Sequence, residues 1–162
     1  MIDNAQVEKI QDELFKDPSL NVYAVIDGAA VKDLRFKLWE MQPEHCCLWA
    51  GKLEPDMEEV APYLILLPRF TEITNWLVEQ IEQYSCGIYV RTKNTMPDVR
   101  KQLRKFLMVS DEQKNIMLFR FYDPRVFSEF MKIMDESQKK QFVSNGMEYV
   151  LTNKNGFFER MS

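Results

Sequence analysis

The densest group of charged side chains in an apolar setting lies in one short stretch. It reads Ile116-Met117-Leu118-Phe119-Arg120-Phe121-Tyr122-Asp123-Pro124-Arg125. A guanidinium stays protonated in proteins and is costly to bury without a partner. We therefore expect Arg120 to form an ion pair, and Asp27, at the end of the first predicted strand, is the candidate partner. The set either binds a ligand or holds the fold, and an internal Arg–Asp pair with Asp123 as the cap of the next helix is the favoured interpretation.

A second basic group lies on a predicted helix. Between Arg91 and Lys105 the chain carries six basic residues and one acid, Asp98. Arg100 and Arg104 are four residues apart, so they share one face of the helix beside its apolar stripe. Such a pair can bind phosphates or the carboxylates of a protein partner, and it can equally face solvent. These three interpretations stay open at the level of sequence.

Few residues stand in a pattern that is typical of catalysis or metal binding. The one histidine, His45, stands beside Cys46 and Cys47, whereas structural zinc sites separate paired ligands by two to four residues. A Cys–His catalytic pair would require a second element to bring Cys86 to His45. We therefore interpret these side chains as packing residues and expect no metal ion.

Motifs for phosphate binding and serine catalysis are absent from the sequence. The acidic segment at residues 54–59 lacks the spacing of a calcium loop, so a solvated loop, or one that docks a basic partner, is the favoured interpretation. We expect no cofactor and no enzymatic activity. The alternative is an enzyme that binds an anion or phosphate ligand through Arg100, Arg104, Arg120 and Arg125.

Length and composition indicate one domain over residues 1–162. Hydrophobic residues make up 46% and charged residues 28%, which is ordinary for a globular protein. A net charge of −4 argues against general nucleic-acid binding, which is typical of strongly basic domains. The three cysteines form no secreted disulfide framework, and neither a signal peptide nor a bilayer-spanning apolar segment is visible. We therefore expect a cytoplasmic protein with no nucleic-acid or membrane partner.

Apolar runs and helix signals alternate along the chain. The sequence predicts helices over residues 4–16, 30–40, 72–84, 95–107, 124–134 and 136–143. It predicts strands over residues 22–26, 46–49, 63–67, 86–90, 116–122 and 149–151, with a turn at 153–156. This alternation predicts an α/β fold with a mostly parallel or mixed central sheet flanked by helices. The carboxyl ends of parallel strands would bring Asp27 and Arg120 to the same edge of that sheet.

Helical spacing also predicts which side chains face the core. Trp39 is expected to face inward from the helix at 30–40, and Val126 and either Ile133 or Met134 from the helix at 124–134. These large apolar side chains would then fill the core and not the surface.

Four short segments together resemble a known family. They read Tyr23-Ala24-Val25-Ile26-Asp27-Gly28-Ala29, Ala61-Pro62-Tyr63-Leu64-Ile65, Asp98-Val99-Arg100-Lys101-Gln102-Leu103-Arg104-Lys105-Phe106-Leu107 and Leu118-Phe119-Arg120-Phe121-Tyr122-Asp123-Pro124-Arg125. They occur in the family's order and extend over residues 20–143, which is most of the chain. In these segments the chain resembles the type VI secretion effector chaperones, which are also called adaptors.

The resemblance implies a non-enzymatic role in the bacterial cytoplasm. Members of that family hold a secreted toxin, the effector, and help to load it onto the VgrG spike of the secretion machine. The partners implied are therefore an effector protein and, as a second candidate, the VgrG spike. The candidate structural or partner-binding residues are Asp27, Arg100, Arg104, Arg120, Asp123 and Arg125. No feature of the sequence indicates an oligomeric state.

The chain departs from the family pattern at two points. Gln102 stands where many members have histidine. Many members also carry an additional C-terminal lobe, for which this chain has almost no room, so we expect the contacts of that lobe to be missing here. Ten methionines and three tryptophans nevertheless provide adaptable and large apolar side chains, which are suited to protein-binding surfaces.

Overall fold

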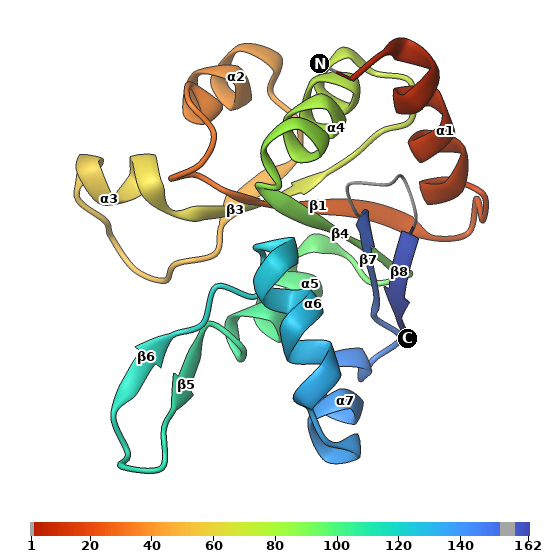
Figure 1. The fold of residues 1–162 in the computed structure, drawn as a ribbon. Helices are drawn as coiled ribbons and strands as arrows, with labels where there is room; N and C mark the ends of the chain where they lie inside the picture. Colours follow the sequence, from red (N-terminus) through yellow and green to blue (C-terminus); the bar gives the residue numbers. More distant parts are fainter. Residues whose placement is uncertain (1, 153–157) are drawn as a thin grey trace.

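A six-stranded antiparallel sheet forms the centre of the molecule, and helices cover both of its faces (Figure 1). The computed structural model describes residues 2–152 and 158–162 of the chain. In spatial order the strands are β2 (His45–Cys47), β3 (Pro62–Leu66), β1 (Asn21–Asp27), β4 (Gly87–Thr92), β7 (Glu148–Thr152) and β8 (Phe158–Met161). Every neighbouring pair in this order is antiparallel.

The prediction of a mostly parallel or mixed sheet is therefore wrong. A continuous apolar run indicates a strand that is covered on both faces, but it carries no information about the direction of its neighbours. Here helices cover both faces of an antiparallel sheet. Six of the seven residues of β1 and all six of β4 are therefore buried, which reproduces the pattern typical of parallel strands.

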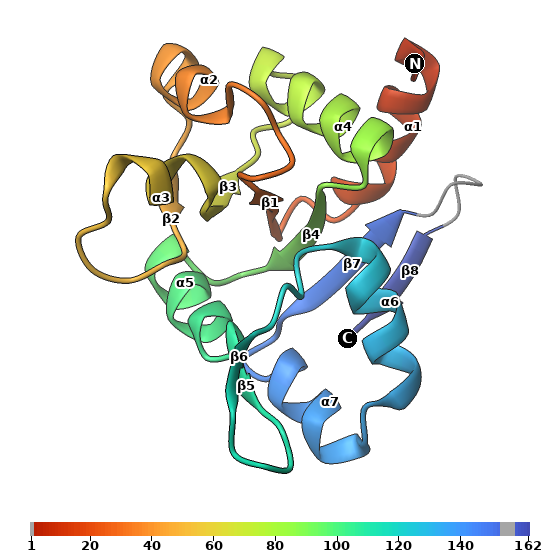
Figure 2. The ribbon, with the colours of Figure 1, turned by 60° about the vertical axis from the view of Figure 1, so that its left-hand side comes forward.

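Helices pack on both faces of the sheet (Figure 2). One face carries α1 (Asn4–Leu14), α2 (Leu34–Met41) and α4 (Glu72–Tyr84), and the short α3 (Pro55–Val60) precedes β3. The opposite face carries α5 (Met96–Arg104), α6 (Pro124–Ile133) and α7 (Glu136–Val143). Alternate residues of β1 enter the two cores, with Val22 and Ala24 in the first and Tyr23 and Val25 in the second.

Most predicted helices are present with nearly the expected ends. The helix at 72–84 has the predicted bounds, and Asp3 starts α1 through a capping box with Gln6. The acidic segment at 54–59, predicted as a loop, is largely helical because it forms α3. Strand β8 is not anticipated, and the turn predicted at 153–156 lies outside the described residues.

A separate two-stranded hairpin projects from the body of the molecule (Figure 1). It consists of β5 (Met108–Ser110) and β6 (Ile116–Leu118), and all six of its strand residues are exposed. Of the core strand predicted at 116–122, only Ile116–Leu118 form a strand, and that strand lies in the exposed hairpin and not in the central sheet. Arg120 lies in the turn that leads from β6 to α6 and not on a strand of the central sheet.

Two side chains expected in the core, Trp39 and Val126, are on the surface, and of the alternatives Ile133 and Met134 it is Met134 that packs against the second core. Trp39 is 70% exposed, Ile133 80% and Val126 37%. In α2 the core contact is made by Leu34 and Leu38, and Trp39 is rotated away from them by one helical step. No helix in the described part of the chain is both long and apolar enough to cross a membrane.

Candidate functional site

Arg120 and Asp27 form the expected ion pair. Nη2 of Arg120 bonds to Oδ2 of Asp27, whose other oxygen accepts the backbone N–H of Ala29 at 2.9 Å. Asp27 ends β1 and is buried, whereas the side chain of Arg120 is 48% exposed. The hydrogen bond to Asp27 raises the pKa of Arg120, so the guanidinium stays charged. The expectation of a buried guanidinium is corrected, because Asp27 is the buried partner and the guanidinium of Arg120 is about half exposed.

Gly28 explains the position of Asp27. Its backbone N–H bonds to the carbonyl oxygen of Ala61 at 3.0 Å, and a side chain at Gly28 would collide with that oxygen. The close approach of these two backbones turns the chain sharply after β1. The turn leaves the carboxylate of Asp27 at the end of the strand, where the guanidinium of Arg120 bonds to it.

Asp123 and Arg125 form a second and separate pair at the start of α6. The carboxylate of Asp123 accepts the backbone N–H of Arg125 at 2.9 Å and its Nε and Nη2 groups at 3.0 and 2.9 Å. Burial opposes ionisation of Asp123, but the hydrogen bonds from Arg125 outweigh it and lower the pKa of the carboxyl below 3.8. Pro124 takes the first turn of the helix, where no N–H is needed. Asp123 is thus a helix cap, as the sequence predicts.

Arg104 fastens α5 to the segment that follows β2. Its Nε donates to the carbonyl oxygen of Leu48 at 2.9 Å and its Nη2 to that of Cys47 at 3.2 Å. Burial raises the pKa of the nearby Cys46 thiol, and the charge of Arg100 opposes that rise. Arg100 and Arg104 therefore lie together on α5, facing the edge of the sheet.

The four candidate arginines are not gathered around one ligand. Arg104 bonds to carbonyl groups beside β2, Arg120 bonds to Asp27, and Arg125 bonds within its own turn. Three of the four guanidinium groups are thus already engaged by other described residues. The arrangement holds separate elements together, and a shared anion pocket is not formed from these contacts.

The cysteines and the histidine are also kept apart. His45 lies on the edge strand β2, and Cys86 directly precedes β4, with β3 and β1 between the two strands. Three strand spacings amount to roughly 14 Å, so these residues cannot form a catalytic pair. All three cysteines are free thiols, and burial raises the pKa of Cys86 to about 12.

The acidic segment at 54–59 is engaged within the chain. Arg35 of α2 forms ion pairs with Glu58 and Glu59 at 2.7 and 2.8 Å. Within residues 2–152 and 158–162 there is no group of three or more histidine, cysteine or acidic side chains that could hold a metal ion.

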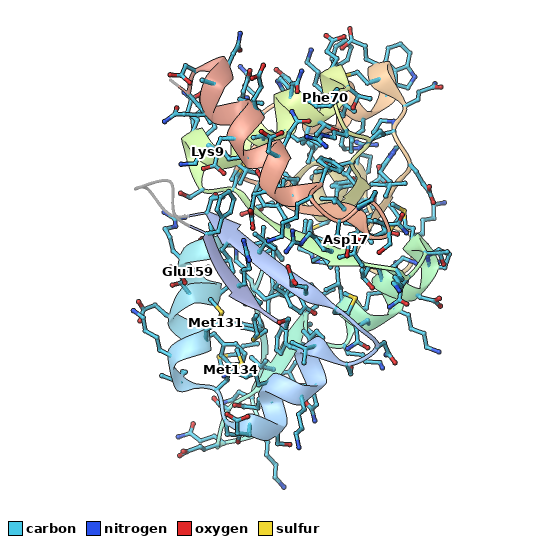
Figure 3. All side chains as sticks on the ribbon, turned by 90° about the vertical axis from the view of Figure 1, so that its right-hand side faces the viewer. Lys9, Asp17, Phe70, Met131, Met134 and Glu159 are labelled. Atoms are coloured by element: carbon cyan, nitrogen blue, oxygen red, sulfur yellow. The ribbon has the colours of Figure 1, made fainter. Side chains whose placement is uncertain are left out.

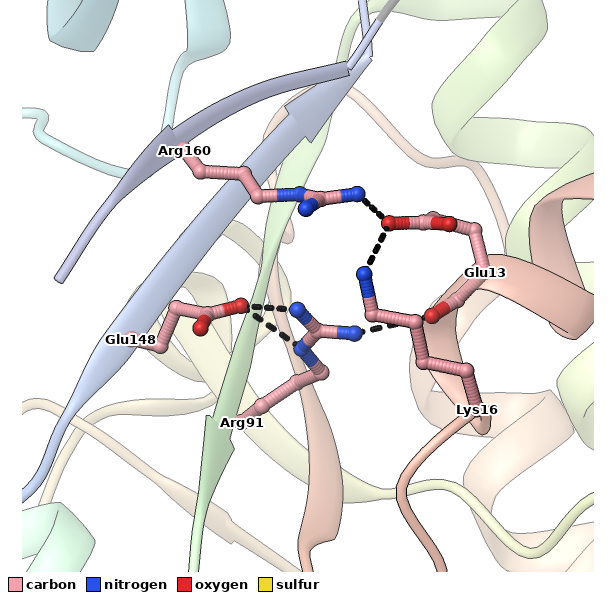
Figure 4. Close-up of polar contacts among 5 residues, drawn as sticks. All are labelled: Glu13, Lys16, Arg91, Glu148 and Arg160. Atoms are coloured by element: carbon pink, nitrogen blue, oxygen red, sulfur yellow. Dashed lines mark hydrogen bonds and ion pairs between the residues drawn. The ribbon is translucent and has the colours of Figure 1, made fainter.

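A buried arginine that sequence reasoning did not single out joins three elements, β4, β7 and α1. Arg91 of β4 is 3% exposed and bonds to Glu148 of β7 and to the backbone carbonyl of Glu13 in α1 (Figure 4). The side chain of Glu13 in turn pairs with Arg160 of β8 and with Lys16. The signal was present in the sequence, because Arg91 directly continues an apolar strand.

The largest unexplained feature of the surface is the projecting hairpin. Its apolar side chains are between 37% and 73% exposed, and we call them the hairpin surface: Met108, Val109, Ile116, Met117 and Leu118. At its base the ring of Phe119 contacts the ring of Phe130 in α6, with 4.8 Å between their centroids. The hairpin is therefore anchored to the body, while its own side chains remain in water.

The comparisons with known proteins identify a family. The model of a family described as "Domain of unknown function (DUF4123)" matches residues 22–141. That range contains the Arg120–Asp27 pair, the Asp123–Arg125 pair and the whole hairpin surface. No curated protein matches the chain, and no solved structure matches it either.

Proposed function

The chain belongs to the DUF4123 family, and from this premise we propose that it is a chaperone or adaptor that binds a secreted effector protein through the hairpin surface. The motifs that resemble type VI secretion adaptors supply the class of client, a toxin that is loaded onto the VgrG spike. Binding takes place in the cytoplasm, before export.

The exposed hairpin surface is the observation that carries this proposal. Aliphatic and methionine side chains occupy both faces of the ribbon, since the pairs Met108–Leu118 and Val109–Met117 lie on opposite sides. Exposure of this much apolar surface on a projecting element is unfavourable in water and supports the assignment of this surface to partner binding. Unbranched methionine side chains adapt to clients of different shape.

The pairing of the arginines supports the same function. Asp27 and Asp123 hold Arg120 and Arg125, and these two pairs position the turn and helix that follow the hairpin. The two ion pairs then maintain the fold, while the hairpin surface binds the effector. The alternative of an anion-binding enzyme has less support, because three of its four arginines are engaged by protein groups.

Co-expression with a candidate client, a toxin exported by the type VI secretion system of the source cell, tests the proposal. The double variant Ile116→Ser/Met117→Ser should keep the melting temperature of the wild type, because both side chains are exposed. It should lose more than about tenfold in toxin affinity, since central apolar contacts dominate binding energy. The matched control is Phe36→Ser/Trp39→Ser, which removes an equally exposed aromatic pair from α2 and should bind normally.

Full retention of the toxin by the hairpin variant would show that another surface binds it. Failure of the wild-type chain to bind the toxin at all would refute the adaptor function.

A further inference from the structure

Helix α5, which leads directly into the hairpin, has an uncompensated positive face. The helix and its C-cap residue carry Arg100, Lys101, Arg104 and Lys105 against one acid, Asp98. No ion pair to Arg100, Lys101 or Lys105 occurs among the described residues. Arg104 bonds only to neutral carbonyl groups, so its charge is not cancelled either.

Two of these cations border a hollow of about 340 Å³ between α5 and the end of α7. The hollow is lined by Asn94, Asp98, Lys101, Gln102, Lys105 and Asn145. Gln102 fixes its floor, because the buried amide donates to the carbonyl oxygen of Gln141 at 2.8 Å and to Oγ of Ser144 at 2.7 Å. Lys101 and Lys105 are four residues apart on the helix and can therefore act on one ligand.

The hollow and the hairpin surface are neighbours along the chain. Lys105 is the C-cap residue of α5, and Met108 begins β5 three residues later. Both side chains are exposed. A bound segment that contacts Met108 and Leu118 therefore has cations beside it, and a negative charge on that segment is attracted to the same place.

We propose that the hollow and the hairpin surface form one site for an acidic, amphipathic segment of the client polypeptide. Its carboxylates bind Lys101 and Lys105, and its apolar side chains cover Met108 and Leu118. This inference rests on the proposed adaptor function and specifies the chemistry of the segment that the adaptor recognises. A nucleic acid fits less well, because the hairpin surface offers aliphatic side chains and no aromatic ring on which bases could stack.

Charge reversal tests this proposal, with the same candidate client toxin, in purified form, as the probe. The variant Lys101→Glu/Lys105→Glu should weaken toxin binding at low salt by at least about tenfold, mainly through slower association. The difference should shrink as salt rises, because exposed charges are screened. Lys101→Arg/Lys105→Arg keeps both charges and should bind within about twofold of the wild type.

Lys9→Glu, which reverses one lysine where the test variant reverses two, is the control for charge reversal at a distant site. Lys9 is an exposed helical lysine with no ion pair among the described residues. It lies on α1, which packs on the opposite face of the sheet from α5, and Figure 3 shows it on the other side of the sheet from Met131 of α6. This variant should bind the toxin normally. A carbodiimide, which joins lysine amines to carboxylates without a spacer, should cross-link Lys101 or Lys105 to acidic residues of the bound toxin.

The outcomes separate this inference from the adaptor function. If the hairpin variant loses the toxin but the α5 charge reversal behaves like Lys9→Glu at every salt concentration, the acidic segment is wrong and the adaptor function stands. If the charge reversal weakens binding of a single-stranded oligonucleotide and not of the toxin, the hollow binds nucleic acid and the proposal is overturned. If the wild type does not bind the toxin, both are refuted.

Discussion

Arg91 and Glu148 face each other across β4 and β7, and two nitrogens of the guanidinium bond to the same carboxylate oxygen. The Nε–Oε1 distance is 2.8 Å, and Nη2 donates to Oε1 as well. The remaining nitrogen, Nη1, reaches the carbonyl oxygen of Glu13 at 2.8 Å. One buried side chain therefore connects two strands of the sheet with the end of α1 (Figure 4).

Arg91→Ala should lower the free energy of unfolding by about 3 kcal/mol, because it leaves the carboxylate of Glu148 and the backbone carbonyl of Glu13 without their donor. Urea unfolding measures the loss. The control is Arg69→Ala, which breaks an exposed ion pair with Asp12 and should cost less than about 1 kcal/mol. Equal losses in the two variants would mean that Arg91 is held no more tightly than a surface arginine.

Arg120→Ala should lower the free energy of unfolding by about 1–3 kcal/mol. The buried carboxylate of Asp27 loses its charged donor but keeps the N–H of Ala29, and water reaches the site where the half-exposed guanidinium lay. Toxin binding should fall together with the melting temperature, since the pair fixes the turn after the hairpin. Loss of binding at an unchanged melting temperature would instead place Arg120 in direct contact with the client.

Glu82 of α4 should make stability depend on pH. Burial raises the pKa of its carboxyl above 4.5, and the hydrogen bond from the hydroxyl of Thr152 only partly opposes this. The folded state therefore binds more protons than the unfolded state between 4.5 and the raised value. The contribution of Glu82 to stability is present below pH 4.5 and is lost as pH rises through its pKa in the folded state.

Glu82→Gln should therefore be more stable than the wild type at neutral pH, and the advantage should vanish towards pH 4.5. Urea unfolding at several pH values measures this difference, and Glu8→Gln, on the exposed face of α1, controls for the loss of a carboxylate. A difference that is constant with pH, or that favours the wild type at neutral pH, contradicts the assignment.

The Arg120–Asp27 ion pair and the helix cap at Asp123 could be predicted from the sequence. A strand that ends in an acid, Asp27, and a guanidinium within an apolar segment, Arg120, each need a partner of opposite charge, and they are in fact paired. The cap at Asp123 followed from the Asp-Pro signal in the same way. These predictions succeeded because each depends on the residue itself and on a single contact.

The remainder depends on relations between distant segments, which residue types do not encode. The sequence of a strand that is buried on both faces is apolar throughout, so it does not indicate whether β1 runs parallel or antiparallel to β3 and β4. Ile116, Met117 and Leu118 have the composition of a core strand, and only the absence of a covering element in the described structure places them in water. The role of Arg91 likewise depends on Glu13 and Glu148, which lie 78 and 57 residues away.

The contacts of Arg91 also bear on where the folding unit begins and ends. The family match covers residues 22–141, yet Glu13, Glu148 and Arg160 all lie outside it. A chain trimmed to the match would expose β4 as a sheet edge. It would also leave the guanidinium of Arg91 without its partners Glu148 and Glu13. The smallest piece able to fold by itself is accordingly longer than the recognisable family segment, and it must retain α1, β7 and β8.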